Sequence, residues 1–142
     1  RGQDIKPTIE SIRGLRREPE SEADLRNKKA TLPAIIFGGY HPTNDAKALE
    51  ESRSGLICVD IDHLDPAELP AKRQQIEASP HTLACFLSPS ANGLKVLNRL
   101  PLPNASFKNN FEQLSAFYQA SFEIGIDQSC KNINRLCSLV SS

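Results

Sequence analysis

Residues 55–62, with the sequence GLICVDID, place the strongest constraint on what this chain can fold into. The apolar run predicts a β-strand that ends in two carboxylates two positions apart. Successive side chains of a strand point to opposite faces, so Asp60 and Asp62 are expected on one face and Val59 and Ile61 on the other. Two like charges on one face repel, and a divalent cation such as Mg²⁺ commonly compensates them. The run therefore predicts a metal site, and the alternative is a strand end where both carboxylates are solvated or cap the next turn.

The rest of the chain shows further regular patterns. An Asn-Gly pair before residue 94 predicts a hairpin turn. Apolar side chains that recur every three or four residues predict an amphipathic helix with its stripe in the core; they are Phe107, Phe111, Leu114, Tyr118 and Phe122. The elements expected from residue 55 onward are strands at 55–62, 82–88, 94–100 and 133–140, with helices at 69–78 and 107–122.

This order of strand, helix, strand, strand, helix, strand predicts an α+β fold with a ferredoxin-like, RRM-like β-α-β-β-α-β core. In that arrangement four strands form one sheet, both helices cover one face, and the Asp60/Asp62 pair is expected on the other face. Residues 1–54 are expected to add an extension that packs on the core at 55–142, and the 142 residues suit a single compact domain. The extension is expected to contain helices near 7–15, 21–29 and 44–52 and a strand at 32–37.

Charge and cysteine content narrow the possible functions. The 17 basic and 17 acidic residues balance, so binding of nucleic acid would need a local patch and not overall charge. No apolar run is long enough to cross a membrane and no signal-peptide pattern opens the chain, so a cytoplasmic protein is expected. The cysteines show no CxxC pair and predict reduced core thiols and not a zinc site; they are Cys58, Cys85, Cys130 and Cys137.

Two further segments carry residues suited to phosphate chemistry. In residues 88–95, SPSANGLK, a turn of small residues exposes backbone N–H groups beside Ser88, Ser90 and Lys95, a combination that suits a triphosphate. The alternative is a plain hairpin with a solvated lysine. In the other segment Asp127 follows the aromatic helix, and Arg135 in the last strand needs an anionic partner, either a carboxylate or a phosphate. The alternative is an internal arginine–aspartate pair that holds the strand.

Together these segments resemble the three motifs of the archaeo-eukaryotic primase superfamily, the primase–polymerases. The closer resemblance is to the primase-like N-terminal domain of VirE-type proteins from phages and mobile elements. It extends from residue 32 to residue 137 through the stretches LPAIIFGG, SGLICVDID, SPSANGLKVL and DQSCKNINRLC.

The resemblance implies a role for each matching residue. It implies that Asp60, Asp62 and Asp127 are catalytic and hold two divalent metal ions, Mg²⁺ or Mn²⁺. It implies that the nucleotide is bound by Ser88, Ser90, Lys95 and Arg135. Two positions depart from the family pattern, because Lys95 stands where many members have histidine and Ala91 replaces the glycine of a Ser-x-Ser-Gly turn.

The function implied by the resemblance is metal-dependent nucleotidyl transfer on a DNA template in the replication of a phage or mobile element, by a two-metal mechanism. The implied partners are nucleoside triphosphates, a single-stranded DNA template and a helicase-type ATPase domain or protein. The alternative is a catalytically inactive nucleotide- or DNA-binding module, favoured by the balanced charge and by Ala91 and Lys95. A nuclease or relaxase-like domain would need a histidine pair and a nucleophilic tyrosine, but Tyr40, His41 and His63 are scattered.

Overall fold

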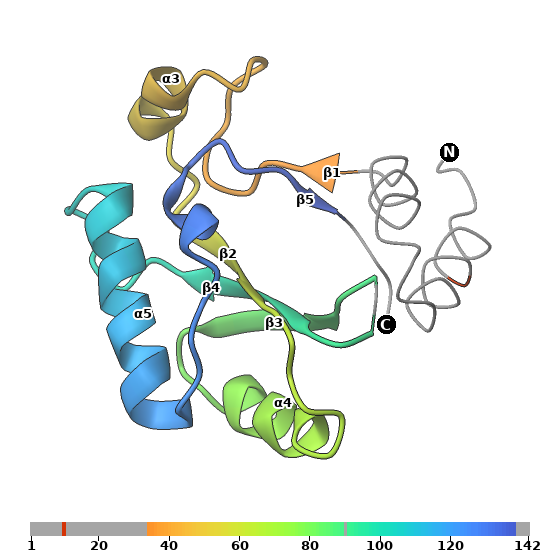
Figure 1. Ribbon diagram of the computed structural model, residues 1–142. Coiled ribbons are helices and arrows are strands. Elements are labelled where there is room, and N and C mark those ends of the chain that lie inside the picture. Colours follow the sequence, from red (N-terminus) through yellow and green to blue (C-terminus); the bar gives the residue numbers. More distant parts are fainter. Residues whose placement is uncertain (1–9, 11–33, 90, 139–142) are drawn as a thin grey trace.

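The computed structural model describes residues 10, 34–89 and 91–138 of the chain. The helices expected near 7–15 and 21–29 lie outside this part, apart from residue 10, and so does Ser90. The described residues form helices and strands in the order shown in Figure 1, with a three-stranded sheet at the centre. The predicted α+β class is confirmed.

The central sheet is antiparallel and contains β2 (Leu56–Ile61), β4 (Leu94–Arg99) and β3 (Thr82–Leu87). Its strand order is β2-β4-β3, so β4 lies in the middle. In the register of β2 and β4, Asp60 lies opposite Lys95. Cross-strand partners in such a pair point to the same face and lie close together. The register therefore brings a carboxylate and an ammonium group together on one face of the sheet.

A second, smaller sheet joins two segments that are far apart in the sequence. In it β1 (Ala34–Ile35) pairs antiparallel with β5 (Cys137–Ser138), with Ile35 opposite Cys137. Within the described part of the predicted strand at 32–37, residues 34–37, only Ala34 and Ile35 form a strand. The division into an extension at 1–54 and a core at 55–142 stays a prediction.

Three α-helices and a 3₁₀ helix complete the described fold. They are α3 (Ala46–Glu51), α4 (Leu69–Glu77), α5 (Phe107–Phe122) and η2 (Gln128–Lys131). Helix α5 begins where the Ser106 hydroxyl accepts a hydrogen bond from the Asn109 N–H, and it ends at Glu123 in the left-handed conformation. The predicted amphipathic helix is confirmed, because α5 contains all five residues of the predicted aromatic stripe.

The main core lies between the central sheet and helices α4 and α5. Alternate residues of β2, Ile57, Val59 and Ile61, are buried in it, as the period of a strand requires. The aromatic stripe of α5 packs there too, and the Tyr118 hydroxyl donates a 2.9 Å hydrogen bond to the buried Asn98 side chain of β4. Asp60, between Val59 and Ile61, therefore points to the opposite face of the sheet.

The prediction that a fourth strand joins the central sheet is wrong. Only Cys137–Ser138 are extended within the described part of the predicted strand at 133–140, and they pair with β1 and not with the central sheet. The free edge of β2 is occupied instead by the segment that contains η2. There the Asp127 N–H donates to the Asp60 carbonyl at 3.0 Å and the Asp60 N–H donates to Cys130 Sγ at 3.3 Å. Because the N–H and carbonyl of Asp60 already have these partners, a fourth strand cannot form hydrogen bonds with them.

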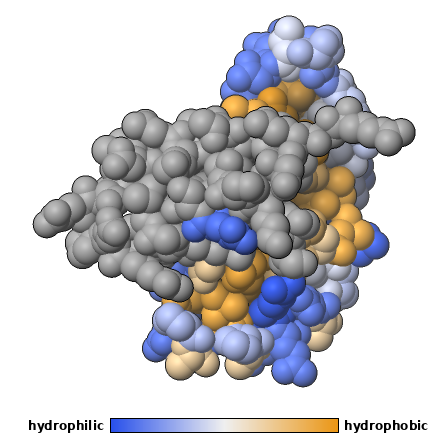
Figure 2. Space-filling view, turned by 90° about the vertical axis from the view of Figure 1, so that its right-hand side faces the viewer, coloured by the Kyte–Doolittle hydropathy of each residue, from blue (hydrophilic) through white to orange (hydrophobic). Residues whose placement is uncertain are grey.

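The surface of the described residues mixes apolar and polar areas, as the face in Figure 2 shows. The large apolar side chains that are most exposed come from separate segments of the chain; they are Ile35, Tyr40, Leu83, Leu102 and Leu136. No single amphipathic element therefore accounts for the apolar surface. Among the helices of the described residues, none is long and apolar enough to cross a membrane.

Candidate functional site

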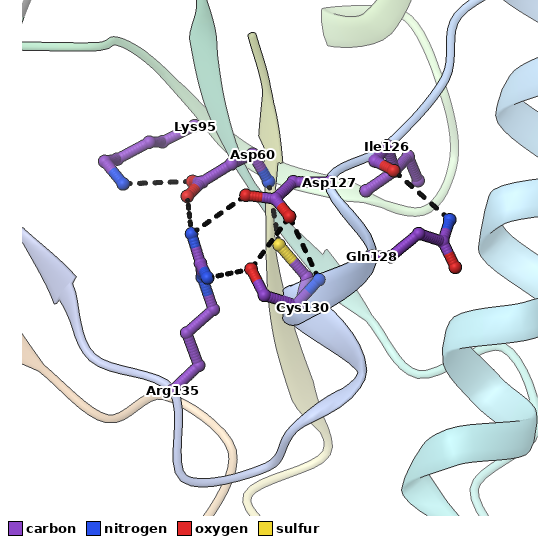
Figure 3. A network of polar contacts seen from close by, with 8 residues as sticks. Asp60, Lys95, Ile126, Asp127, Gln128, Cys130 and Arg135 are labelled. Carbon is purple, nitrogen blue, oxygen red and sulfur yellow. Dashed lines mark hydrogen bonds and ion pairs between the residues drawn. The ribbon is translucent and has the colours of Figure 1, made fainter.

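Asp60 is the centre of a group of charged side chains on the sheet face opposite the helices (Figure 3). Asp60 is only 6% exposed, and each of its carboxylate oxygens forms an ion pair. Oδ1 lies 2.9 Å from Lys95 Nζ, and Oδ2 lies 2.6 Å from Arg135 Nη2. The register of β2 and β4 places Lys95 beside Asp60. Arg135 belongs to the segment between η2 and β5.

Asp127 is the second carboxylate of this group and the N-cap of η2. Its Oδ1 accepts hydrogen bonds from the Ser129 N–H at 3.0 Å and from the Ser129 hydroxyl at 2.8 Å. Its Oδ2 lies 3.2 Å from Arg135 Nη2, and Arg135 Nη1 also donates to the Ser129 hydroxyl. We call Asp60, Lys95, Asp127 and Arg135 the ion-pair network. It connects β2, β4, η2 and the segment before β5.

Opposite charges set the protonation of the network. Burial favours the neutral form of Lys95, but the adjacent Asp60 outweighs it and raises the pKa of the lysine. In the same way burial disfavours the charged Arg135, while the hydrogen bond to Asp60 leaves its pKa raised. Burial also works to raise the pKa of Asp127, but the Ser129 hydrogen bonds and Arg135 leave it lowered from 3.8. Lys95, Asp127 and Arg135 are therefore charged at neutral pH.

The structure separates residues that the sequence placed together. Strand β2 ends at Ile61, and the chain turns at His63, whose φ is +56°. Asp62 is exposed and is not among the residues that form the ion pairs of the network, so the expected pair of Asp60 and Asp62 is not formed. Ser88 is buried at the end of β3, where its N–H donates to the Gly93 carbonyl at 2.9 Å.

The predicted metal centre is wrong for the described residues. Residues 10, 34–89 and 91–138 contain no group of three or more histidine, cysteine, aspartate or glutamate side chains that could hold a metal ion. The physical reason is that Asp62 is exposed beyond the end of β2 and that both oxygens of Asp60 already face cations. A metal ion at Asp60 would have to displace Lys95 and Arg135. Two positive side chains compensate the carboxylates in place of a divalent cation.

A small cavity next to the network was not predicted from the sequence. It has a volume of about 10 Å³, room for one water molecule, and Arg135 lines it together with Cys58, Cys130 and Cys137. Arg135 Nε is buried and has no hydrogen-bond partner among the described residues. Three thiols from β2, η2 and β5 meet here although no spacing in the sequence relates them. The apolar runs around these cysteines indicated burial only.

A family model described as BT4734-like, N-terminal domain, matches residues 27–141. No curated protein and no solved structure matches the chain. The matching family differs from the VirE-type primase–polymerase domain that the motifs resemble, so that assignment is wrong. The predictions of templated nucleotidyl transfer and of a role in the replication of a phage or mobile element are overturned with it.

Proposed function

This chain belongs to the BT4734-like N-terminal domain family, and on that premise we propose that the domain binds the phosphate groups of a nucleoside triphosphate at Lys95 and Arg135. One observation carries the proposal: two cations that lie apart in the sequence converge on one face of the sheet, with the Arg135 side chain 28% exposed. A guanidinium that meets solvent is well suited to a phosphate, because its planar N–H groups match the phosphate oxygens.

The contacts of Arg135 show which partner a phosphate would replace. The 2.6 Å contact with Asp60 is buried, whereas the 3.2 Å contact with Asp127 is longer and involves a carboxylate side chain that is 30% exposed. Asp127 would keep its two hydrogen bonds from Ser129 after losing the arginine. The exchange of Asp127 for a phosphate therefore leaves no buried carboxylate without a partner, and Asp60 keeps the arginine in place.

A purely structural network is the second candidate. It is favoured by Asp60, whose oxygens are both paired and which is almost completely buried. In that case Lys95 and Arg135 only hold their segments against β2, and no ligand competes for them. The two candidates differ in what the removal of the Asp127 charge does to ligand binding.

The test is a calorimetric titration of the domain with a nucleoside triphosphate and, separately, with inorganic tripolyphosphate, in buffer that contains EDTA. We expect both to bind, and we expect Arg135→Gln to weaken binding by roughly tenfold, the effect of about 1.4 kcal/mol. Asp127→Asn should tighten binding, because it removes the competing charge and an asparagine can still cap η2. Circular dichroism verifies that each variant is folded.

Arg99→Gln is the matched control. Arg99 lies on the same strand as Lys95, four residues further on and therefore on the same face, but it is exposed and outside the network. Its replacement should leave the dissociation constant unchanged. If wild type binds neither ligand, or if Asp127→Asn and Arg99→Gln affect binding equally, the network is structural and the proposal is wrong.

A further inference from the structure

Two cysteine thiols from different sheets meet beside the ion-pair network. Cys58 belongs to β2 of the central sheet, and Cys137 belongs to β5 of the small sheet. Both line the cavity that has room for one water molecule, and each influences the pKa of the other. Both are free thiols. The sequence separates them by 79 positions, so the contact is a product of the fold.

We propose that Cys58 and Cys137 are a redox-active pair that closes to an intramolecular disulfide when the domain meets hydrogen peroxide. Both thiols line the same small cavity, so an oxidant that reaches one thiol is also next to the other. The inference does not rest on the proposed binding of a nucleotide.

The environment distinguishes the two thiols. The pKa of Cys58 is raised, first by its hydrogen bond to Cys137 and then by burial. The pKa of Cys137 is lowered, because it receives that hydrogen bond and because Lys95 is near, although burial works against it. The thiolate is the reactive form of cysteine, so Cys137 is the thiol that meets the oxidant first.

The reaction balances with one molecule of hydrogen peroxide. The Cys137 thiolate attacks one peroxide oxygen and the O–O bond breaks, which gives a sulfenic acid and hydroxide; the hydroxide takes up the proton that Cys137 released. Cys58 sulfur then attacks the Cys137 sulfur, the S–O bond breaks, and the departing hydroxide takes the Cys58 proton. Two thiols are oxidised to one disulfide, and the peroxide is reduced to two water molecules.

The other two cysteines are less suited to this reaction. Cys130 lines the same cavity, but its sulfur accepts the Asp60 N–H, and burial raises its pKa to about 12. Cys85 lies in the core between sheet and helices, where burial raises its pKa to about 11. Both stay protonated at neutral pH and serve as internal comparisons for Cys137.

The chain offers a direct measurement of which thiols join. Trypsin cleavage after lysine and arginine places Cys58 in peptide 54–72, Cys85 in 74–95, Cys130 in 109–131 and Cys137 in 136–142. The folded domain is treated with hydrogen peroxide, free thiols are then blocked with an alkylating reagent, and the digest is analysed by mass spectrometry without reductant. We expect peptide 54–72 linked to 136–142, and the loss of that link in Cys137→Ser.

The melting temperature gives a second readout. A disulfide across a loop of this length should raise it by roughly 10 °C, and addition of dithiothreitol should reverse the rise. Cys130→Ser should keep both the link and the rise. A link between 54–72 and 109–131, or oxidation of folded wild type to sulfinic acid with no link at all, would overturn the proposal. Because the mapping uses wild type, the result does not depend on a variant that fails to fold.

Discussion

Asp60 and Asp62 stand two positions apart in the sequence and have opposite environments. Asp60 is buried and pairs with Lys95 and Arg135, whereas Asp62 is exposed beyond the end of β2. Replacing a buried carboxylate that has two cationic partners removes an anion from a site where its partners are shielded from water. The energetic importance of the two residues should therefore differ strongly.

We expect Asp60→Asn to lower the free energy of unfolding by about 3 kcal/mol, because Lys95 then loses its anion in a largely buried position and Arg135 keeps only its longer contact with Asp127. Asp62→Asn should change it by less than about 0.5 kcal/mol, as is usual at the surface. Urea denaturation of both variants measures the difference. Equal losses of stability would contradict the central place of Asp60 in the network.

Among the glycines of the described residues, Gly93 in the turn between β3 and β4 has the least room for a side chain. A Cβ atom added at Gly93 would lie 2.2 Å from the Ile61 carbonyl oxygen of β2. Ala91 in the same turn has a φ of +64°, a conformation that costs energy for any residue with a side chain. The turn thus fits against the end of β2 only because residue 93 is glycine.

Gly93→Ala should lower the free energy of unfolding by about 2 kcal/mol, since the turn must move away from β2. Gly125→Ala is the matched control, because a Cβ there meets nothing within 4 Å. Its effect should stay within about 0.5 kcal/mol. Thermal or chemical denaturation of the two variants tests this, and a Gly93→Ala protein as stable as wild type would show that the turn adapts freely.

The elements also show what local sequence can and cannot predict. The aromatic stripe of α5 and the strands at β2, β3 and β4 depend on the pattern of apolar residues, and the sequence located them well. The position of the last segment depends on competition for the edge of β2, where Asp127 and Cys130 bond the backbone of Asp60. The site follows the same rule: the sequence singled out Lys95, Arg135 and Asp127 one by one, but their positions around Asp60 follow from the register of β2 with β4 and from the path of the chain.

At the scale of the whole molecule, the free energy of unfolding should depend on pH, and Asp127 should contribute to this dependence. The pKa of Asp127 is lowered in the folded state. At this group the folded chain therefore binds fewer protons than the unfolded chain, in which the pKa of an aspartate is near 3.9. The stabilisation is fully present above about pH 5 and is lost as the pH falls through the folded value. The free energy of unfolding of the Asp127→Asn variant should therefore fall less steeply than that of wild type as the pH drops below about 5. Parallel curves for wild type and variant, from urea titrations at several pH values, would contradict this origin.

At the scale of the whole molecule, the segment around η2 also limits how copies of the protein can meet. An uncovered edge strand presents free N–H and C=O groups to which a strand of another molecule can add, the usual start of aggregation. Here Asp127 and Cys130 bond both backbone groups of Asp60 at the outer edge of β2. The same charged segment that holds Arg135 against the sheet thus protects this part of the edge against intermolecular strand addition.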